Sequence, residues 1–91
     1  MSISAGSVSL SESSPTVVYE TPAGVETTLV VQVAETYDND AYFGQSDVSS
    51  TTGIVLNNQS PPLTLTGFTG TLYGLASSGS TSAVYLAADL R

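Results

Sequence analysis

The feature that most constrains this chain is a series of short apolar and β-branched segments, each cut off by turn-forming residues. No segment combines a sustained helical period with helix caps. Turn signals recur roughly every ten residues, which is typical of an all-β sandwich or barrel. The sequence predicts strands over residues 7–11, 16–20, 26–36, 41–43, 54–56, 63–66, 71–76 and 83–87. We therefore expect an all-β fold, a small antiparallel β-sandwich or barrel of about seven to eight short strands.

The strongest predicted strand covers residues 26–36. Its side chains alternate between two faces, and we expect the face made by Leu29, Val31 and Val33 to point into the core. The preceding Pro22-Ala23-Gly24 has turn chemistry. A loop is expected at 57–62, because consecutive prolines do not fit a central strand.

With 91 residues, the chain has the length of one domain. We expect residues 15–91 to form a single β-sandwich domain and residues 1–14 to form an extended N-terminal arm or an edge strand. As an arm, this segment would add a strand to the sheet of a neighbouring subunit, with Val8 and Leu10 as candidate partner contacts. Deleting residues 2–13 would then weaken binding without unfolding the domain.

The charge balance argues against several classes of partner. The net charge is −7, and Arg91 is the single basic residue. Binding to nucleic acid or to an anionic membrane surface needs several Lys or Arg side chains, so neither is expected. Charged residues make up 10% of the chain, against about 25% in an average protein. Such low charge favours a protein that functions inside an assembly.

The residue types present also argue against catalysis. The chain has no His, Cys or Lys, which removes the usual general base, the thiol nucleophile and Schiff-base chemistry. We therefore expect no enzyme activity and no cofactor. Asp38, Asn39, Asp40 and Asp47 offer oxygen ligands for calcium. The alternative is a solvated turn in which Asp and Asn bond their own backbone, and the pattern favours the turn over a metal site.

Five tyrosines in so short a chain are a further feature. Tyrosine is enriched at interfaces because it joins a large apolar ring to a polar tip. It is also common on half-buried strand faces, and packing within the domain is the ordinary explanation for most of the five. Tyr37 and Tyr42, which flank the polar 38–40 segment, are the candidates for partner contact.

The stretch from Tyr37 to Asp89 resembles the small β-sandwich capsid decoration and minor head proteins of tailed bacteriophages. Their shared features are a polar turn before an aromatic-Gly strand end, a Ser-Asp-Val step, a Gly-apolar-x-Leu strand, an alternating strand and a Leu-Tyr strand ending in a Gly turn. In this chain they are Asp38 to Gly44, Ser46 to Val48, Gly53 to Leu56, Leu63 to Leu65 and Leu72 to Gly79. Where those proteins often carry Pro-Gly before the alternating strand, this chain has Pro61-Pro62.

The resemblance implies a structural virion protein on the capsid surface, which decorates or cements the shell by binding across capsid subunits. Its partners would be the major capsid protein and copies of itself, as a homo-oligomer on the virion. Two other functions fit the same sequence. One is a virion protein of the tail or head–tail junction, and the other is an adhesive module that binds carbohydrate or protein.

Overall fold

The computed structural model describes residues 2–34, 40–49, 51–57 and 59–90, and within them the fold is all-β without a helix. Side chains are described for these residues except those at 2, 80 and 90. Eight strands follow one another along the chain. They are β1 (Ser2–Ser11), β2 (Thr16–Glu20), β3 (Glu26–Val33), β4 (Ala41–Gly44), β5 (Ile54–Leu56), β6 (Leu63–Phe68), β7 (Thr71–Ala76) and β8 (Ser80–Leu90).

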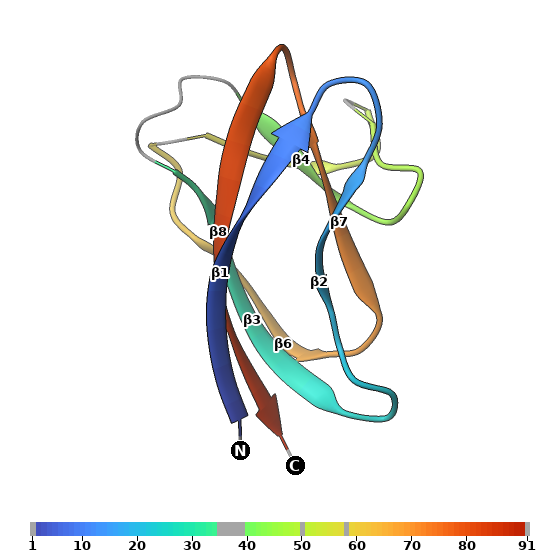
Figure 1. Ribbon diagram of the computed structural model, residues 1–91, viewed down its shortest axis with the longest axis vertical. Coiled ribbons are helices and arrows are strands. Elements are labelled where there is room, and N and C mark those ends of the chain that lie inside the picture. The colour runs from blue at the N-terminus through green and yellow to red at the C-terminus, as the bar shows by residue number, and fades with distance from the viewer. Residues whose placement is uncertain (1, 35–39, 50, 58, 91) are drawn as a thin grey trace.

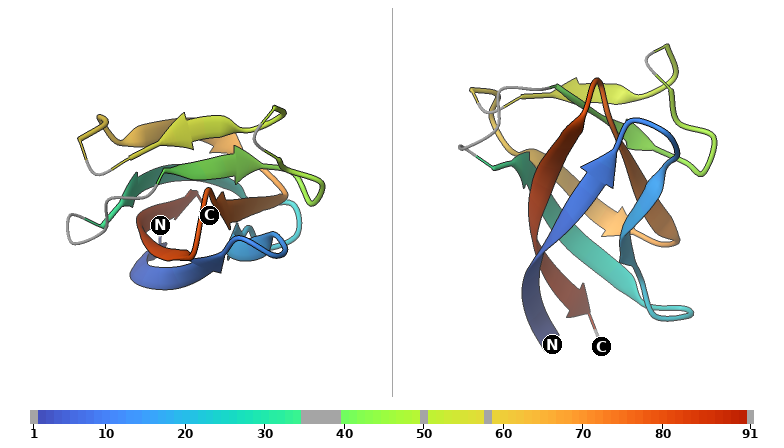
Figure 2. Two further views of the ribbon diagram at one scale, coloured as in Figure 1. Left: turned by 90° about the horizontal axis from the view of Figure 1, so that it is seen from above. Right: turned by 45° about the horizontal axis from the view of Figure 1, so that its top comes forward.

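The strands form two four-stranded antiparallel sheets, which confirms the expected fold class (Figures 1 and 2). Sheet A has the order β1-β8-β3-β6, and sheet B has the order β2-β7-β4-β5. The first strand thus pairs with the last, the second with the seventh, the third with the sixth and the fourth with the fifth. This nested pairing of eight strands in two sheets is the order of a jelly roll.

The core lies between the two sheets and is built from strand residues that alternate inward. In β3, Leu29, Val31 and Val33 are all buried, which confirms the face predicted from the sequence. Phe43 from β4 is the largest fully buried side chain. The other core members come from both sheets: Leu10, Val18, Ala41, Leu56, Leu72, Ala76, Ala83 and Ala87.

Two β-bulges interrupt the alternation. In β2, Val17 opposes Tyr73 while Tyr19 already opposes Leu72, so β2 carries an extra residue. As a result Val18 is buried and its neighbour Tyr19 also packs against the core. The second bulge is in β6, where Phe68 pairs with Thr27 of β3 and Leu65 pairs with Leu29, so β6 has one residue more than β3 between these pairs. Gly67 lies in this bulge and has φ of 63°. A glycine in the left-handed region is the usual solution at such a bulge.

The turn predicted at Pro22-Ala23-Gly24 is present. The Val25 N–H donates to the Pro22 carbonyl at 3.0 Å, and Gly24 has φ of 73°. Positive φ at the third residue, after a proline that opens the turn, gives a type II turn, in which a side chain at Gly24 would be strained.

The N-terminal segment is an edge strand and not a free arm. β1 pairs with β8 of its own chain, from Ser2 opposite Asp89 to Ser11 opposite Ser80. Leu10 is only 1% exposed and belongs to the core, and Val8 packs against it. Of the two alternatives expected for this segment, the structure has the edge strand, whose alternating apolar side chains close one side of the sandwich.

Thr81 provides a stability prediction. It is 1% exposed, and among the described buried side chains its hydroxyl is the polar atom without a hydrogen-bond partner. We expect Thr81→Val to raise the free energy of unfolding by about 1 kcal/mol, because the cost of burying an unpaired hydroxyl disappears. Urea denaturation measures the change.

Thr27 is the matched control for this substitution. It is fully buried, and its hydroxyl donates to Asp89 Oδ1 at 2.8 Å. Thr27→Val should therefore lower the free energy of unfolding by about 1–3 kcal/mol. Equal signs for the two substitutions would contradict this account of the Thr81 hydroxyl.

Candidate interaction surfaces

Charge is unevenly distributed over the molecule. The described acidic residues lie in connections or at the ends of strands, apart from Asp89, which is buried. The exposed or half-exposed acids are Glu12, Glu20, Glu26, Asp40 and Asp47. The middle of both sheet faces is consequently free of described charged side chains, although the chain carries a net charge of −7.

The outer face of sheet A carries an apolar patch, which we call surface A. Antiparallel partners point to the same face, so the register places Ala5, Leu86 and Val30 side by side across β1, β8 and β3. Ile3 and Ala88 form the next such pair. Ile3 is 65% exposed and Leu86 is 49% exposed, which is high for such side chains. Surface A therefore offers unpaired apolar area on three neighbouring strands.

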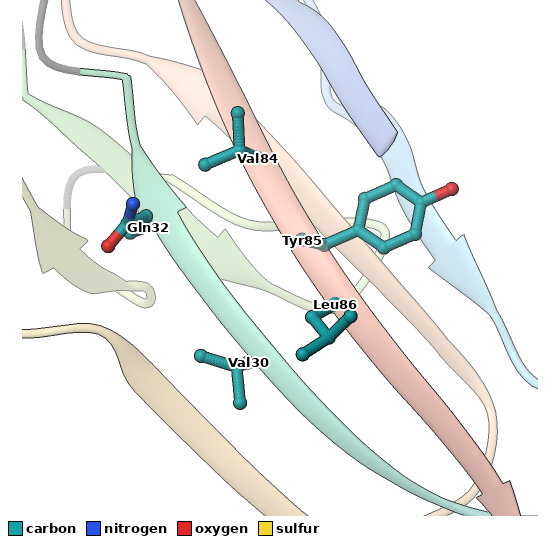
Figure 3. Close-up of a pocket in the computed structure, with 5 residues that line it drawn as sticks. All are labelled: Val30, Gln32, Val84, Tyr85 and Leu86. Atoms are coloured by element: carbon teal, nitrogen blue, oxygen red, sulfur yellow. The ribbon is translucent and has the colours of Figure 1, made fainter. Parts of the chain in front are cut away.

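A shallow groove of about 230 Å³ runs along surface A (Figure 3). Val30 and Gln32 line it from β3, and Val84 and Leu86 line it from β8, while the Tyr85 ring turns away towards β1 and β2. Small-molecule sites are usually larger, at about 300–1,000 Å³, and more enclosed. The groove is thus better suited to a protruding side chain of a protein partner than to a cofactor.

The outer face of sheet B carries a second patch, which we call surface B. Tyr42 in β4 lies between Val55 of β5 and Leu75 of β7, and Val17 of β2 lies opposite Tyr73. Val55 is 52% exposed and Val17 is 45% exposed. The two tyrosines are half-buried, and the register puts them on the same face of the sheet. This combination of exposed Val and half-buried Tyr is typical of protein contact surfaces.

The four residues predicted as partner contacts fall in different places. Tyr42 lies on surface B, where a partner can reach it. Val8 is half-buried against the core, and Leu10 is buried within it, so the contact predicted for Leu10 is wrong for this folded domain. Tyr37 lies outside the described residues. Sequence reasoning missed Val17, Val55 and Leu86, because an apolar residue in a short strand looks like a core residue until its register is known.

A buried polar cluster ties the two sheets together at the end of β8. Asp89, 7% exposed, accepts a hydrogen bond from the Tyr19 hydroxyl at 2.9 Å and from the Thr27 hydroxyl at 2.8 Å, both on Oδ1. The Tyr19 ring also packs on Tyr85 at 5.4 Å between centroids, with the planes tilted by 53°. The cluster is explained by structure alone, since it satisfies a buried carboxylate.

The same cluster makes stability depend on pH. Burial, and then the hydrogen bond to Asp89, raise the pKa of Tyr19 above its usual 10.0. The unfolded chain loses this proton first, so the stability that Tyr19 contributes is complete below pH 10.0 and declines as pH rises through its folded pKa. Tyr19→Phe should lower the free energy of unfolding by about 1–2 kcal/mol near neutral pH, because one hydrogen bond to a carboxylate is lost.

Urea denaturation of both proteins over a pH series tests this prediction. The difference in free energy of unfolding between wild type and Tyr19→Phe should shrink above about pH 10, where the raised pKa of Tyr19 makes its stabilising contribution decline. If the difference in free energy of unfolding between the two proteins stays constant at every pH measured above 10, Tyr19 does not have the raised pKa.

The acidic segment proposed as a turn or a calcium site is only partly described. Residues 38 and 39 lie outside the described residues, and Asp47 is exposed in the connection between β4 and β5. Within the described residues, no group of three or more acidic, His or Cys side chains is arranged to hold a metal ion. No helix in the described part of the chain has the length and hydropathy to cross a membrane.

The chain matches none of the protein-family models, and none of the curated proteins matches it either.

Proposed function

We propose that this protein is a structural virion protein of a tailed bacteriophage, which decorates the capsid by binding across capsid subunits without catalysing a reaction. The observation that carries the proposal is the distribution of charge. Surfaces A and B are apolar and free of described charged side chains, whereas the exposed acids lie at strand ends and in connections.

This arrangement suits a subunit held between neighbours. Apolar faces without charge can be covered by another protein without leaving an unpaired charge buried. The exposed acids at the two ends would stay in water, where they keep the free chain soluble. Val17, Val55 and Leu86 would be the residues that lose most exposed area on binding.

The fold is compatible with the proposal but does not assign it. Jelly rolls occur in viral capsid proteins and also in lectins and other binding domains. Function must therefore be argued from the surfaces and not from the strand order. The surfaces support a role in an assembly of some kind. The sequence resemblance to phage decoration proteins is what supports the virion as that assembly.

The test is to mix the purified chain with capsids assembled without it, sediment the particles and image them. We expect saturable binding at regular lattice positions. Leu86→Lys changes surface A and Val55→Lys changes surface B, and at least one of them should weaken binding by at least about tenfold. Ala23→Lys, in the exposed type II turn, has the same change of charge and should bind as wild type.

Other outcomes would move the protein to a different function. If the images show the protein bound at a single vertex, it belongs at the head–tail junction. If they show it along the tail, it is a tail protein. Absence of binding to every particle would leave the adhesive module, for which Tyr42 and Tyr73 on surface B are the aromatic side chains available to stack on a sugar. A glycan array tests that alternative directly.

A further inference from the structure

The edge of sheet A formed by β1 differs from the other sheet edges. An unpaired strand edge offers N–H and C=O groups to any other strand, and proteins usually block such edges with charges, prolines, bulges or short length. The sheet orders leave four strands with one neighbour each among the described strands: β1 and β6 in sheet A, and β2 and β5 in sheet B.

Three of these edges carry a protective feature. β5 is only three residues long. β2 contains a bulge and directly follows Pro15, and β6 contains the Gly67 bulge and directly follows Pro61-Pro62. Each of these features interrupts the regular row of backbone groups that a second strand would need.

β1 has none of these features. It is ten residues long and keeps one unbroken register with β8 from end to end. Its sequence from Ser2 to Ser11 contains no charged residue and no proline. In Figures 1 and 2 no other strand lies beyond the N-terminal half of β1 on the side away from β8.

We propose that β1 pairs antiparallel with β1 of a second copy about a twofold axis, which makes one continuous eight-stranded sheet from two sheets A. The pairing concerns the free chain and does not depend on the proposed virion role. An antiparallel strand edge is complementary to itself under a twofold axis, so a second copy supplies the partner without any further adaptation.

Charge favours a second copy at this edge in spite of the net charge of −7. β1 is uncharged, and the nearest described acid along the chain is Glu12, just beyond its end. Antiparallel pairing centred between residues 5 and 7 places the two Glu12 side chains at opposite ends of the paired strands. At about 3.3 Å per residue they are more than about 30 Å apart, well beyond the screening distance of roughly 8 Å at physiological salt.

The pleat restricts the register of the pair. A twofold axis perpendicular to the sheet keeps the outer faces on one side, so only residues of the same face can be opposite each other. The axis must then pass midway between the two copies of one residue, which lie opposite each other. Axes at Ala5, Gly6 and Ser7 bring together Ala5 with Ala5, Ala5 with Ser7, and Ser7 with Ser7, respectively. In each case surface A continues across the new junction.

Sedimentation equilibrium of the purified chain, from about 1 µM to about 1 mM, is the first test. We expect a reversible dimer of the 9.3 kDa chain. Ala5 and Ser7 are both exposed on the outer face of β1, and each of the three axes brings like charges within about 7 Å for at least one of Ala5→Lys and Ser7→Lys. At least one of these two substitutions should therefore weaken the dimer at least about tenfold. Thr64→Lys is the matched control, since Thr64 is exposed on the outer face of the other edge strand of sheet A, and it should dimerise as wild type.

A monomer at every concentration would overturn the proposal. So would a dimer that both Ala5→Lys and Ser7→Lys leave intact, or one that Thr64→Lys abolishes, because either result puts the contact elsewhere.

Cysteine cross-linking tests the same edge without adding charge, and it covers the case in which Ser7→Lys fails to fold. The chain has no native cysteine, so each introduced thiol is unique. Opposite residues in an antiparallel pair have Cα atoms about 4.5–5.5 Å apart, within reach of a disulfide. Ala5→Cys alone, Ser7→Cys alone, and a mixture of the two report the three possible axes. One of these samples should form covalent dimers on mild oxidation, and failure of all three would refute the pairing.

Discussion

Deletion of residues 2–13 is expected to unfold the domain. The deletion removes β1 with Leu10, which is 1% exposed, and Val8, which packs against the core. Truncating one buried Leu to Ala already costs about 2–5 kcal/mol, and a whole strand costs more. A domain of this size has a total stability of about 5–15 kcal/mol, with small domains at the low end. Circular dichroism and a thermal melt should show loss of the sheet signal and of the cooperative transition.

A shorter deletion is the control for this result. Residues 2–5 lie at the start of β1, and Ile3, Ser4 and Ala5 are exposed. Removing them leaves Val8 and Leu10 in place, so the domain should stay folded with reduced stability. A cooperative melt of the 2–13 deletion would instead support the free arm that the sequence allowed.

Phe43→Ala is the point substitution with the largest expected effect. Phe43 is 1% exposed, lies in β4 at the centre of the core, and is the largest fully buried side chain. Loss of its ring should lower the free energy of unfolding by about 3–5 kcal/mol, through lost apolar burial and the cavity left behind. Urea denaturation measures the change, and the same sample should bind a hydrophobic dye if part of the population is unfolded.

Val55→Ala on the neighbouring strand separates folding from binding. Val55 is 52% exposed, so its truncation should change stability by no more than about 0.5 kcal/mol. A comparable loss for both substitutions would mean that surface B is covered in the free protein. A loss below about 1 kcal/mol for Phe43→Ala would mean that the core is not packed as described.

The local elements were largely predictable because their signals are local. Apolar alternation marks β3 and selects Leu29, Val31 and Val33 as its core face, and Pro22 with Gly24 marks the type II turn. The strand ends were less predictable. The last predicted strand, 83–87, is longer in the structure, where it covers Ser80–Leu90. Pairing with β1 and β3 keeps the added residues in the strand conformation, although their sequence alone gives only a weak strand signal.

The pairing of the strands and their register could not be predicted from the sequence. Nothing local indicates that β1 pairs with β8, and a Ser-rich alternation reads equally as an arm. The bulge at Val17 and Tyr19 changes which side chains face inward and brings the Tyr19 hydroxyl to Asp89. For the same reason the candidate surfaces could be only partly predicted. Tyr42 was identified by its residue type, whereas Leu86 and Val55 become surface residues only once their strands have a register.

The nested strand pairing described above also affects how the chain folds. Among the described strands, only β4 and β5 are successive strands that pair with each other. Each further pair, β3 with β6, β2 with β7 and β1 with β8, encloses the one before it. Most contacts therefore join residues far apart in sequence, and such chains fold on the slow timescale of about milliseconds to seconds. During synthesis β1 is made first and cannot pair until β8 has been made. Until then the backbone N–H and C=O groups on both edges of this uncharged strand have no partner strand. The molecule is thus most exposed to association with other copies before it has finished folding.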